Sequence, residues 1–92
     1  EKMVIEVETS NLKEVEEALG AGADIIMLDN MDNETMQKAV DMIDGKAKTE
    51  ASGNMSPERL ADVAATGVDF ISVGALTHSV KAMDISQTIF SD

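Results

Sequence analysis

Residues 24–45, with the sequence DIIMLDNMDNETMQKAVDMIDG, show the pattern of one strand followed by one helix. The unbroken apolar run at the start predicts a strand at about 24–28, because parallel strands are commonly covered on both faces. Apolar residues at three- and four-residue spacing then predict a helix at about 34–43, which Asp32 or Asn33 can cap. The segment is therefore typical of a βα unit.

The same pattern occurs three more times along the chain. Strands that begin at near-regular intervals and alternate with helices are typical of a parallel sheet. We therefore predict an α/β fold in which residues 1–92 form a single unit of four βα repeats. The other predicted strands lie at about 3–7, 47–50 and 68–73. One further helix is predicted at about 12–19, a second begins at Pro57 after the cap Ser56, and a third begins near Asp84.

A cluster of polar residues follows the apolar part of each predicted strand. In a sheet built from βα repeats, the carboxyl ends of the strands open on one rim, where barrel and doubly wound enzymes place their chemistry. We therefore expect the clusters to lie near one another. They are residues 6–10 (EVETS), 28–30 (LDN), 50–54 (EASGN) and 74–79 (GALTHS).

The composition limits the classes of partner. The chain has 92 residues, a formal net charge of −11 and no cysteine, and its size suggests one domain or a piece of one. Because binding to nucleic acid or to an acidic membrane depends on Lys and Arg, we expect neither as a partner. No run is apolar enough for a membrane span or a signal peptide, so we expect a cytoplasmic protein without disulfides or thiolate metal sites.

Carboxylates stand near the ends of three predicted strands. Asp29 directly follows an apolar run, where an unpaired buried carboxylate would be costly, and it therefore indicates a ligand, a cation or a buried hydrogen-bond network. Glu8 lies nearer the predicted rim than Glu6 and is the better functional candidate. Glu50 also ends a strand, but it can pair structurally with Lys48 or with a partner.

The segment Ser52-Gly53-Asn54 leads into the predicted helix that Ser56 caps. Glycine permits unusual backbone angles and the close approach of a ligand, while a serine hydroxyl and nearby N–H groups can bind an anion. The segment therefore fits a phosphate-binding loop, and it fits a plain turn equally well.

The segment at 74–79, which contains Gly74, Ala75 and His78, is similar to the second half of a barrel phosphate site. Such sites often use the loops after the last strands together with the N-terminus of a short helix. A lone histidine such as His78 fits ordinary hydrogen bonding as well as a catalytic role.

At these clusters the sequence resembles the quinolinate phosphoribosyltransferases, also called carboxylating nicotinate-nucleotide pyrophosphorylases. The match spans nearly all of the chain, in order and at plausible spacing, and its longest phrase is highly specific. The matching phrases are IEVE at 5–8, IMLDN at 26–30, EASGN at 50–54, TGVDFISVGALTHS at 66–79 and MDIS at 83–86.

The resemblance implies transfer of phosphoribosyl from phosphoribosyl pyrophosphate to quinolinate, with decarboxylation and with Mg²⁺ as the cofactor. The products would be nicotinate mononucleotide, pyrophosphate and CO₂. It also implies the C-terminal half of a TIM-like barrel, whose N-terminal domain and first barrel half are absent from this chain. Those parts would hold the basic residues that grip quinolinate, so we expect the isolated chain to be inactive.

The resemblance also implies roles for individual residues. Asn54 stands where many relatives have a second glycine, and this weakens the expectation that a ligand comes close to the backbone at that position. The implied roles are ribose and metal binding for Glu8 and Asp29, one phosphate loop for Ser52, Gly53 and Asn54, and a second phosphate loop for Gly74, Ala75 and His78.

Two other interpretations remain open at this point. The first is an excised or engineered half-barrel without activity, which would dimerise through its unpaired sheet edges or rearrange into an open flavodoxin-like sheet with helices on both faces. The second is a phosphoacceptor signalling domain that uses Asp29, although Lys81 lies well past the fourth predicted strand.

Overall fold

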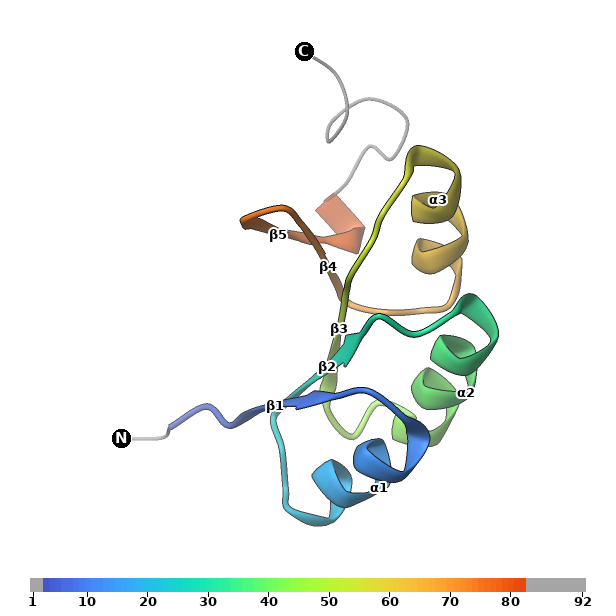
Figure 1. The fold of residues 1–92 in the computed structure, drawn as a ribbon. Coiled ribbons are helices and arrows are strands. Elements are labelled where there is room, and N and C mark those ends of the chain that lie inside the picture. The colour runs from blue at the N-terminus through green and yellow to red at the C-terminus, as the bar shows by residue number, and fades with distance from the viewer. Residues whose placement is uncertain (1–2, 83–92) are drawn as a thin grey trace.

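The computed structural model describes residues 3–82, which form one sheet of five strands with three helices. The strands lie in sequence order across the sheet. The first four strands run parallel to one another, and the fifth pairs antiparallel with the fourth (Figure 1). The strands are β1 (Glu6–Thr9), β2 (Ile25–Asp29), β3 (Lys48–Ser52), β4 (Phe70–Val73) and β5 (Leu76–Ser79).

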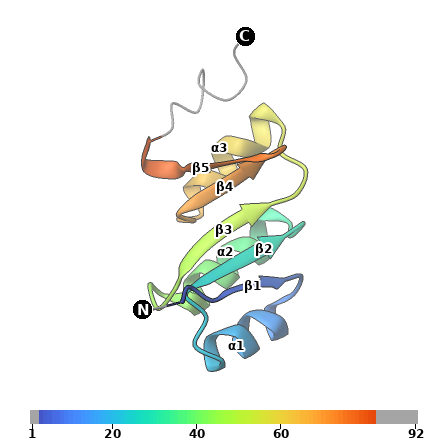
Figure 2. The ribbon, with the colours of Figure 1, turned by 90° about the vertical axis from the view of Figure 1, so that its left-hand side faces the viewer.

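All three α-helices pack against the same face of the sheet, as Figures 1 and 2 show from two directions. They are α1 (Leu12–Gly20), α2 (Asn33–Ile43) and α3 (Pro57–Ala65), and a short 3-10 helix, η1 (Val80–Ala82), follows β5. None of the helices within residues 3–82 has the length and the apolar composition needed to cross a membrane.

The predicted α/β fold and its four parallel strands are confirmed, with shifts of a few residues at the strand ends. The alternative of an open flavodoxin-like sheet does not describe residues 3–82, because their strands follow sequence order and their helices cover one face only. The sequence patterns did not reveal β5, which occupies part of the segment expected to be a loop. The helix predicted from about Asp84 lies outside the described residues.

Each helix begins at a side chain that accepts a hydrogen bond from a backbone N–H group of the first turn. The oxygen of Asn11 accepts from the amide of Glu14 at 2.9 Å, and that of Asp32 accepts from Thr35 at 2.7 Å. Ser56 caps α3, which has Pro57 in its first turn as predicted. These bonds satisfy amides that have no partner inside the helix, so the helices begin where the caps place them.

Two aspartates each tie the start of one strand to the strand beside it. Asp24, just before β2, accepts a hydrogen bond from the amide of Ile5 at 2.9 Å. Asp69, just before β4, accepts from the amide of Thr49 at 2.9 Å and from its hydroxyl at 3.2 Å. Each pair lies at the end of the sheet opposite to the rim, so these carboxylates stabilise strand register there.

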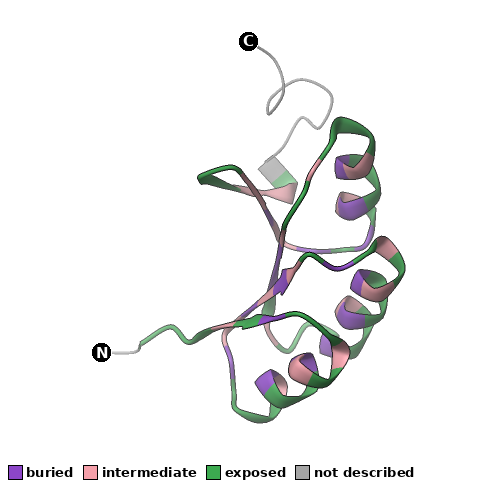
Figure 3. Cartoon of the chain, in the orientation of Figure 1, coloured by how far each residue is buried: buried purple, intermediate pink, exposed green. Residues whose placement is uncertain are grey.

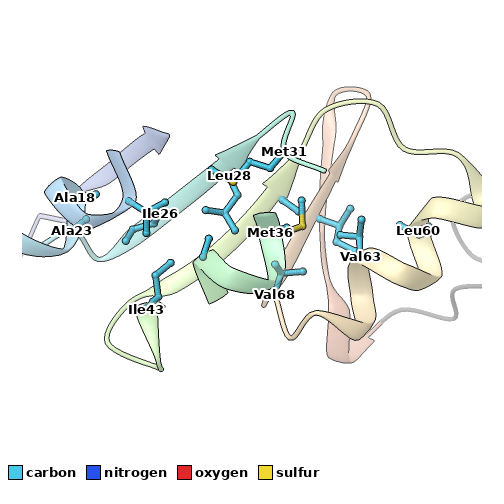
Figure 4. Packing of buried hydrophobic residues seen from close by; sticks show 14 residues of the cluster. Ala18, Ala23, Ile26, Leu28, Met31, Met36, Ile43, Leu60, Val63 and Val68 are labelled. Atoms are coloured by element: carbon cyan, nitrogen blue, oxygen red, sulfur yellow. The ribbon is translucent and has the colours of Figure 1, made fainter. Parts of the chain in front are cut away.

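The hydrophobic core lies between the sheet and the helices, where the buried sides of the helices face the strands (Figure 3). Figure 4 shows the cluster, in which Ile26 and Leu28 of β2 are fully buried. Burying one such side chain contributes about 1.5–3 kcal/mol relative to leaving it exposed. The helices contribute mainly Val15, Ala18, Met36, Ala39, Ile43, Leu60 and Val63.

Among residues 3–82, no helix lies over the other face of the sheet, as Figure 2 shows, and we call it the open face. Because side chains alternate between faces along a strand, and because register partners point to the same face, the pairing of the strands defines its residues. They are Glu6, Glu8, Ile25, Met27, Asp29, Lys48, Glu50, Ser52, Phe70, Ser72, Thr77 and Ser79. The open face thus carries four carboxylates and one lysine.

Candidate functional site

Asp29 and Ser52 are register partners at the carboxyl ends of β2 and β3. The Ser52 hydroxyl donates a hydrogen bond to Asp29 Oδ1 at 2.9 Å, and both residues are half-buried. This bond fixes the orientation of the carboxylate, whose oxygens together offer about four lone-pair positions. Of the alternatives predicted for Asp29, a ligand, a cation or a buried hydrogen-bond network, the structure shows one hydrogen bond to a half-buried carboxylate, and the role of Asp29 stays a prediction.

The turn after β3 packs closely against the loop after β2. Gly53 has a φ of 124°, and a Cβ placed there would lie 3.1 Å from the Cα and 3.2 Å from the N of Asn30. The Asn30 amide also donates to the carbonyl of Ser52 at 2.9 Å, and Asn30 itself has a φ of 55°. A side chain at Gly53 would therefore meet backbone, so the tight turn requires glycine here.

A second polar network joins β3 to the β4–β5 hairpin. Glu50, with 8% of its surface exposed, accepts a hydrogen bond from the Ser72 hydroxyl. The hydroxyls of Ser72 and Thr77 lie 3.1 Å apart. Glu50 therefore has a serine partner in the next strand rather than Lys48. Sequence reasoning missed Ser72, although its alternation with Ile71 and Val73 places it on the face opposite to the core.

Glu8 lies on β1, exposed on the open face, and is the register partner of Met27. Asp29 follows two residues later on the neighbouring strand, so the two carboxylates share a face of adjacent strands. Within the part of the chain that the structure describes, no three acidic, histidine or cysteine side chains are grouped to hold a metal ion. Glu8 and Asp29 thus do not form an all-protein metal cage.

Gly74 and Ala75 form the two-residue turn between β4 and β5. Gly74 has a φ of 61°, and a Cβ added there would meet no atom within 4 Å. His78 is the register partner of Ile71, a core residue, so its side chain lies on the helix-covered side of the sheet. The structure therefore separates the imidazole of His78 from Asp29 and Ser52, which are on the open face.

The remaining predicted residue, Asn54, is exposed, and its carbonyl accepts a hydrogen bond from Arg59 at 2.7 Å. Sequence reasoning did not single out Arg59. Lys81 lies in η1, and it lines a pocket together with Lys48 and Asp69 at the end of the sheet opposite to Asp29. The phosphoacceptor interpretation is therefore wrong, because it requires a lysine beside the strand-end aspartate.

The N-terminus of α2 lies next to the rim and already holds an anion. Hydrogen bonds from Thr35 hold the pKa of Asp32 below its ordinary value of 3.8, with smaller contributions from the positive charges of Lys38 and Arg59. The Asp32 carboxylate is therefore ionised at neutral pH and occupies the electropositive end of this helix.

The chain matches the family model described as "Quinolinate phosphoribosyl transferase, C-terminal domain" over residues 1–88. A probable carboxylating nicotinate-nucleotide pyrophosphorylase of Bacillus subtilis is 45% identical over 85 residues, covering 92% of this chain and 29% of the relative. A protein of the same description from Methanocaldococcus jannaschii is 48% identical over 92 residues, covering 92% of this chain and 32% of the relative.

Solved structures show the same similarity. The nicotinate-nucleotide pyrophosphorylase from Francisella tularensis has a TM-score of 0.75 and 49% identity, over 80% of this chain and 27% of that chain. The corresponding protein from Ehrlichia chaffeensis has a TM-score of 0.77 and 40% identity, over 79% of this chain and 27% of that chain. The chain thus spans about three-tenths of the length of the curated relatives that it matches.

Proposed function

The chain belongs to the family of the quinolinate phosphoribosyl transferase C-terminal domain, and from this premise we propose that it provides the phosphoribosyl-binding half of an active site. The complete enzyme would transfer phosphoribosyl from phosphoribosyl pyrophosphate to quinolinate, a step in NAD biosynthesis. The pyridine nitrogen would form the new bond to the ribose while pyrophosphate leaves, and one ring carboxylate would leave as CO₂, with a proton taking its place on the ring carbon. A cytoplasmic location is part of the same proposal.

The observation that carries this proposal is the arrangement of Asp29, Ser52 and Gly53 at one rim. Ser52 orients the Asp29 carboxylate, and Gly53 brings the next turn against the backbone of the β2–α2 loop. The rim therefore presents an oriented carboxylate beside a glycine turn that leads into the N-terminus of α3. Backbone N–H groups in such turns bind phosphate, and a carboxylate can hydrogen-bond the ribose hydroxyls.

The second phosphate loop of the proposal is the β4–β5 turn. Gly74 and Ala75 would offer backbone N–H groups, and Asn54 would extend the first loop beside Gly53. The side chain of His78 lies on the helix-covered side of the hairpin, so His78 would contribute to this second loop and not to the group of Asp29 and Ser52. The pyrophosphate and the 5-phosphate of the substrate would thus be bound mainly by backbone, which suits a chain with a net charge of −11.

The carboxylates of the open face fit a Mg²⁺ ion that the substrate brings to the site. Mg²⁺ is usually held by one or two carboxylates together with substrate phosphates and waters, rather than by an all-protein cage. Glu8 and Asp29 are two such carboxylates on adjacent strands, and they would hold the ion, directly or through water. When bound, Mg²⁺ would neutralise charge on the departing pyrophosphate.

We also propose that this sheet is half of a TIM-like barrel. The described part of the chain has its strands in sequence order and its helices on one face only, and this is the arrangement found along the wall of such a barrel, where the other face points inward. The open face would then line the barrel interior, and the basic residues that grip quinolinate would come from the other half. Without them the isolated chain would show little activity.

The proposal is tested by mixing the chain with the N-terminal part of a full-length relative and measuring formation of nicotinate mononucleotide. We expect activity in the mixture and not in either part alone. Asp29→Asn should lower that activity by about 100-fold, because it removes charge stabilisation at the reacting ribose. Glu6→Gln is the matched control, since it removes one charge from the same face farther from the rim. Equal activity of Asp29→Asn and wild type would overturn the proposal.

A second candidate function is self-association of the chain as a structural fragment. Met3, Val4 and Ile5, which precede β1 at one edge of the sheet, are 83%, 66% and 48% exposed. Apolar residues beside an unpaired strand edge are typical of surfaces that add another strand. Light scattering over a range of concentrations would detect such a dimer, and a monomer at the highest concentration would exclude it.

A further inference from the structure

Arg59, the single arginine of the sequence, joins two loops of the rim. It lies in the first turn of α3 and is half-buried. Its Nε donates to Asn33 Oδ1 at 3.3 Å, and one terminal nitrogen donates to the carbonyl of Asn54 at 2.7 Å. The other terminal nitrogen donates to the carbonyl of Met31. One guanidinium thus binds acceptors from the β2–α2 side and from the β3–α3 loop.

These contacts act on the residues that the proposed site uses. The loop after β2 begins at Asn30, directly beyond Asp29, and the loop after β3 contains Gly53 and Asn54. The hydrogen bond from the Asn30 amide to the Ser52 carbonyl joins the two loops where they leave their strands. The hydrogen bonds of Arg59 to the carbonyls of Met31 and Asn54 join them again farther along the chain. The two loops are therefore held to each other at two places.

We propose that Arg59 is a positioning residue, which holds these two loops in register so that the turn at Gly53 can bind phosphate. This inference rests on the function proposed above. Each of the three guanidinium nitrogens of Arg59 already donates one hydrogen bond within the protein, so the role assigned to Arg59 is to hold the loops and not to supply the main phosphate contact. Its positive charge would still favour an anion nearby, and the two effects can be separated by experiment.

Lysine at this position would keep the charge and lose the geometry. A guanidinium presents five N–H groups in a fixed planar fork, whereas an ammonium is a compact charge on a flexible stem. An ammonium cannot bond three acceptors that lie in different directions around the guanidinium plane. Arg59→Lys therefore tests positioning, Arg59→Gln tests positioning and charge together, and Lys13→Gln controls for the loss of one positive charge from an exposed site on α1.

The experiment titrates phosphoribosyl pyrophosphate with Mg²⁺ into the 92-residue chain and its three variants by calorimetry. The temperature is set so that circular dichroism shows all four proteins folded. Hydrogen exchange of the Asn30 amide is measured alongside that of Ile26, a core strand residue, which reports global opening. We expect both Arg59 variants to bind about tenfold more weakly, as is typical when a supporting residue is lost, and Lys13→Gln to bind like wild type.

We also expect faster exchange at Asn30 in both Arg59 variants, with little change at Ile26. Binding by Arg59→Lys equal to wild type would overturn the inference, because charge alone would then suffice. Unchanged exchange at Asn30 in the variants would also overturn it. If the wild-type chain binds no phosphoribosyl pyrophosphate, the proposed function fails separately, and the exchange at Asn30 alone decides whether Arg59 holds the loops.

Discussion

The helix-covered face and the open face of the sheet alternate along the same strands. In β2, Ile26 and Leu28 point to the helices and are fully buried, whereas Met27 and Asp29 point the other way and are half-buried. The covered face is mainly apolar, and the open face carries most of the polar side chains proposed to bind substrate. Substitutions one position apart in a strand should therefore have different effects. Those on the covered face should change the free energy of unfolding, and those on the open face should change substrate binding.

The largest effect is expected for Leu28→Ala. Leu28 is 0% exposed in the core, and removing a buried leucine side chain typically lowers the free energy of unfolding by about 2–5 kcal/mol. Met27→Ala, one residue earlier on the open face, should cost about 1 kcal/mol, because its side chain is only partly buried. Urea unfolding of both variants measures the difference. Equal losses would contradict the distinction between the faces.

A smaller effect is expected where the two faces meet at the rim. Gly53→Ala should lower the free energy of unfolding by about 2–3 kcal/mol, because its φ of 124° is unfavourable for alanine and its Cβ would lie 3.1 Å from backbone. Gly74→Ala should cost only about 1 kcal/mol, since its φ of 61° suits the left-handed region and the space around it is empty.

Thermal and urea unfolding of these two glycine variants provide the comparison. The Gly53 variant should also lose the hydrogen bond from Asn30 to Ser52, which hydrogen exchange at Asn30 would show as faster exchange. A Gly74 variant that is less stable than the Gly53 variant would mean that the β4–β5 turn, and not the β2–β3 rim, is the more constrained loop.

The sequence was sufficient to predict the parallel strands, because each apolar run and each cap is a local signal. The buried run of β2, the spacing in α2 and the Ser56-Pro57 start of α3 are all confirmed. The strand ends were less well predicted: β1 begins at Glu6, not Met3, since Met3, Val4 and Ile5 are exposed and precede the strand.

The hairpin and the polar partners were not predictable from local patterns. β5 has the sequence LTHS, with little apolar alternation, and its strand forms only because β4 lies beside it. Likewise, the partners of Glu50 and Arg59 lie at least 5 and up to 28 residues away in sequence, so they depend on the folded arrangement. The nearness of the strand-end clusters was expected, whereas the pairing of Asp29 with Ser52 depends on the register of β2 and β3, which the sequence did not show.

The smallest expected effect is a pH dependence confined to the helix side of the molecule. The pKa of Asp32 is lowered in the folded chain, chiefly by the hydrogen bond from the Thr35 amide, so its ionised form stabilises the fold. That stability is present above the ordinary pKa of about 3.8 and is lost as the pH falls through the lower folded value. Urea midpoints measured between pH 2.5 and pH 6 should therefore drop less steeply toward acid in Asp32→Asn than in wild type.

Asparagine keeps a capping oxygen, so the variant removes the titration and preserves the cap. Phosphoribosyl pyrophosphate binding at neutral pH should be the same in both proteins, and a clear loss of binding in Asp32→Asn would show that the helix side also takes part in the site.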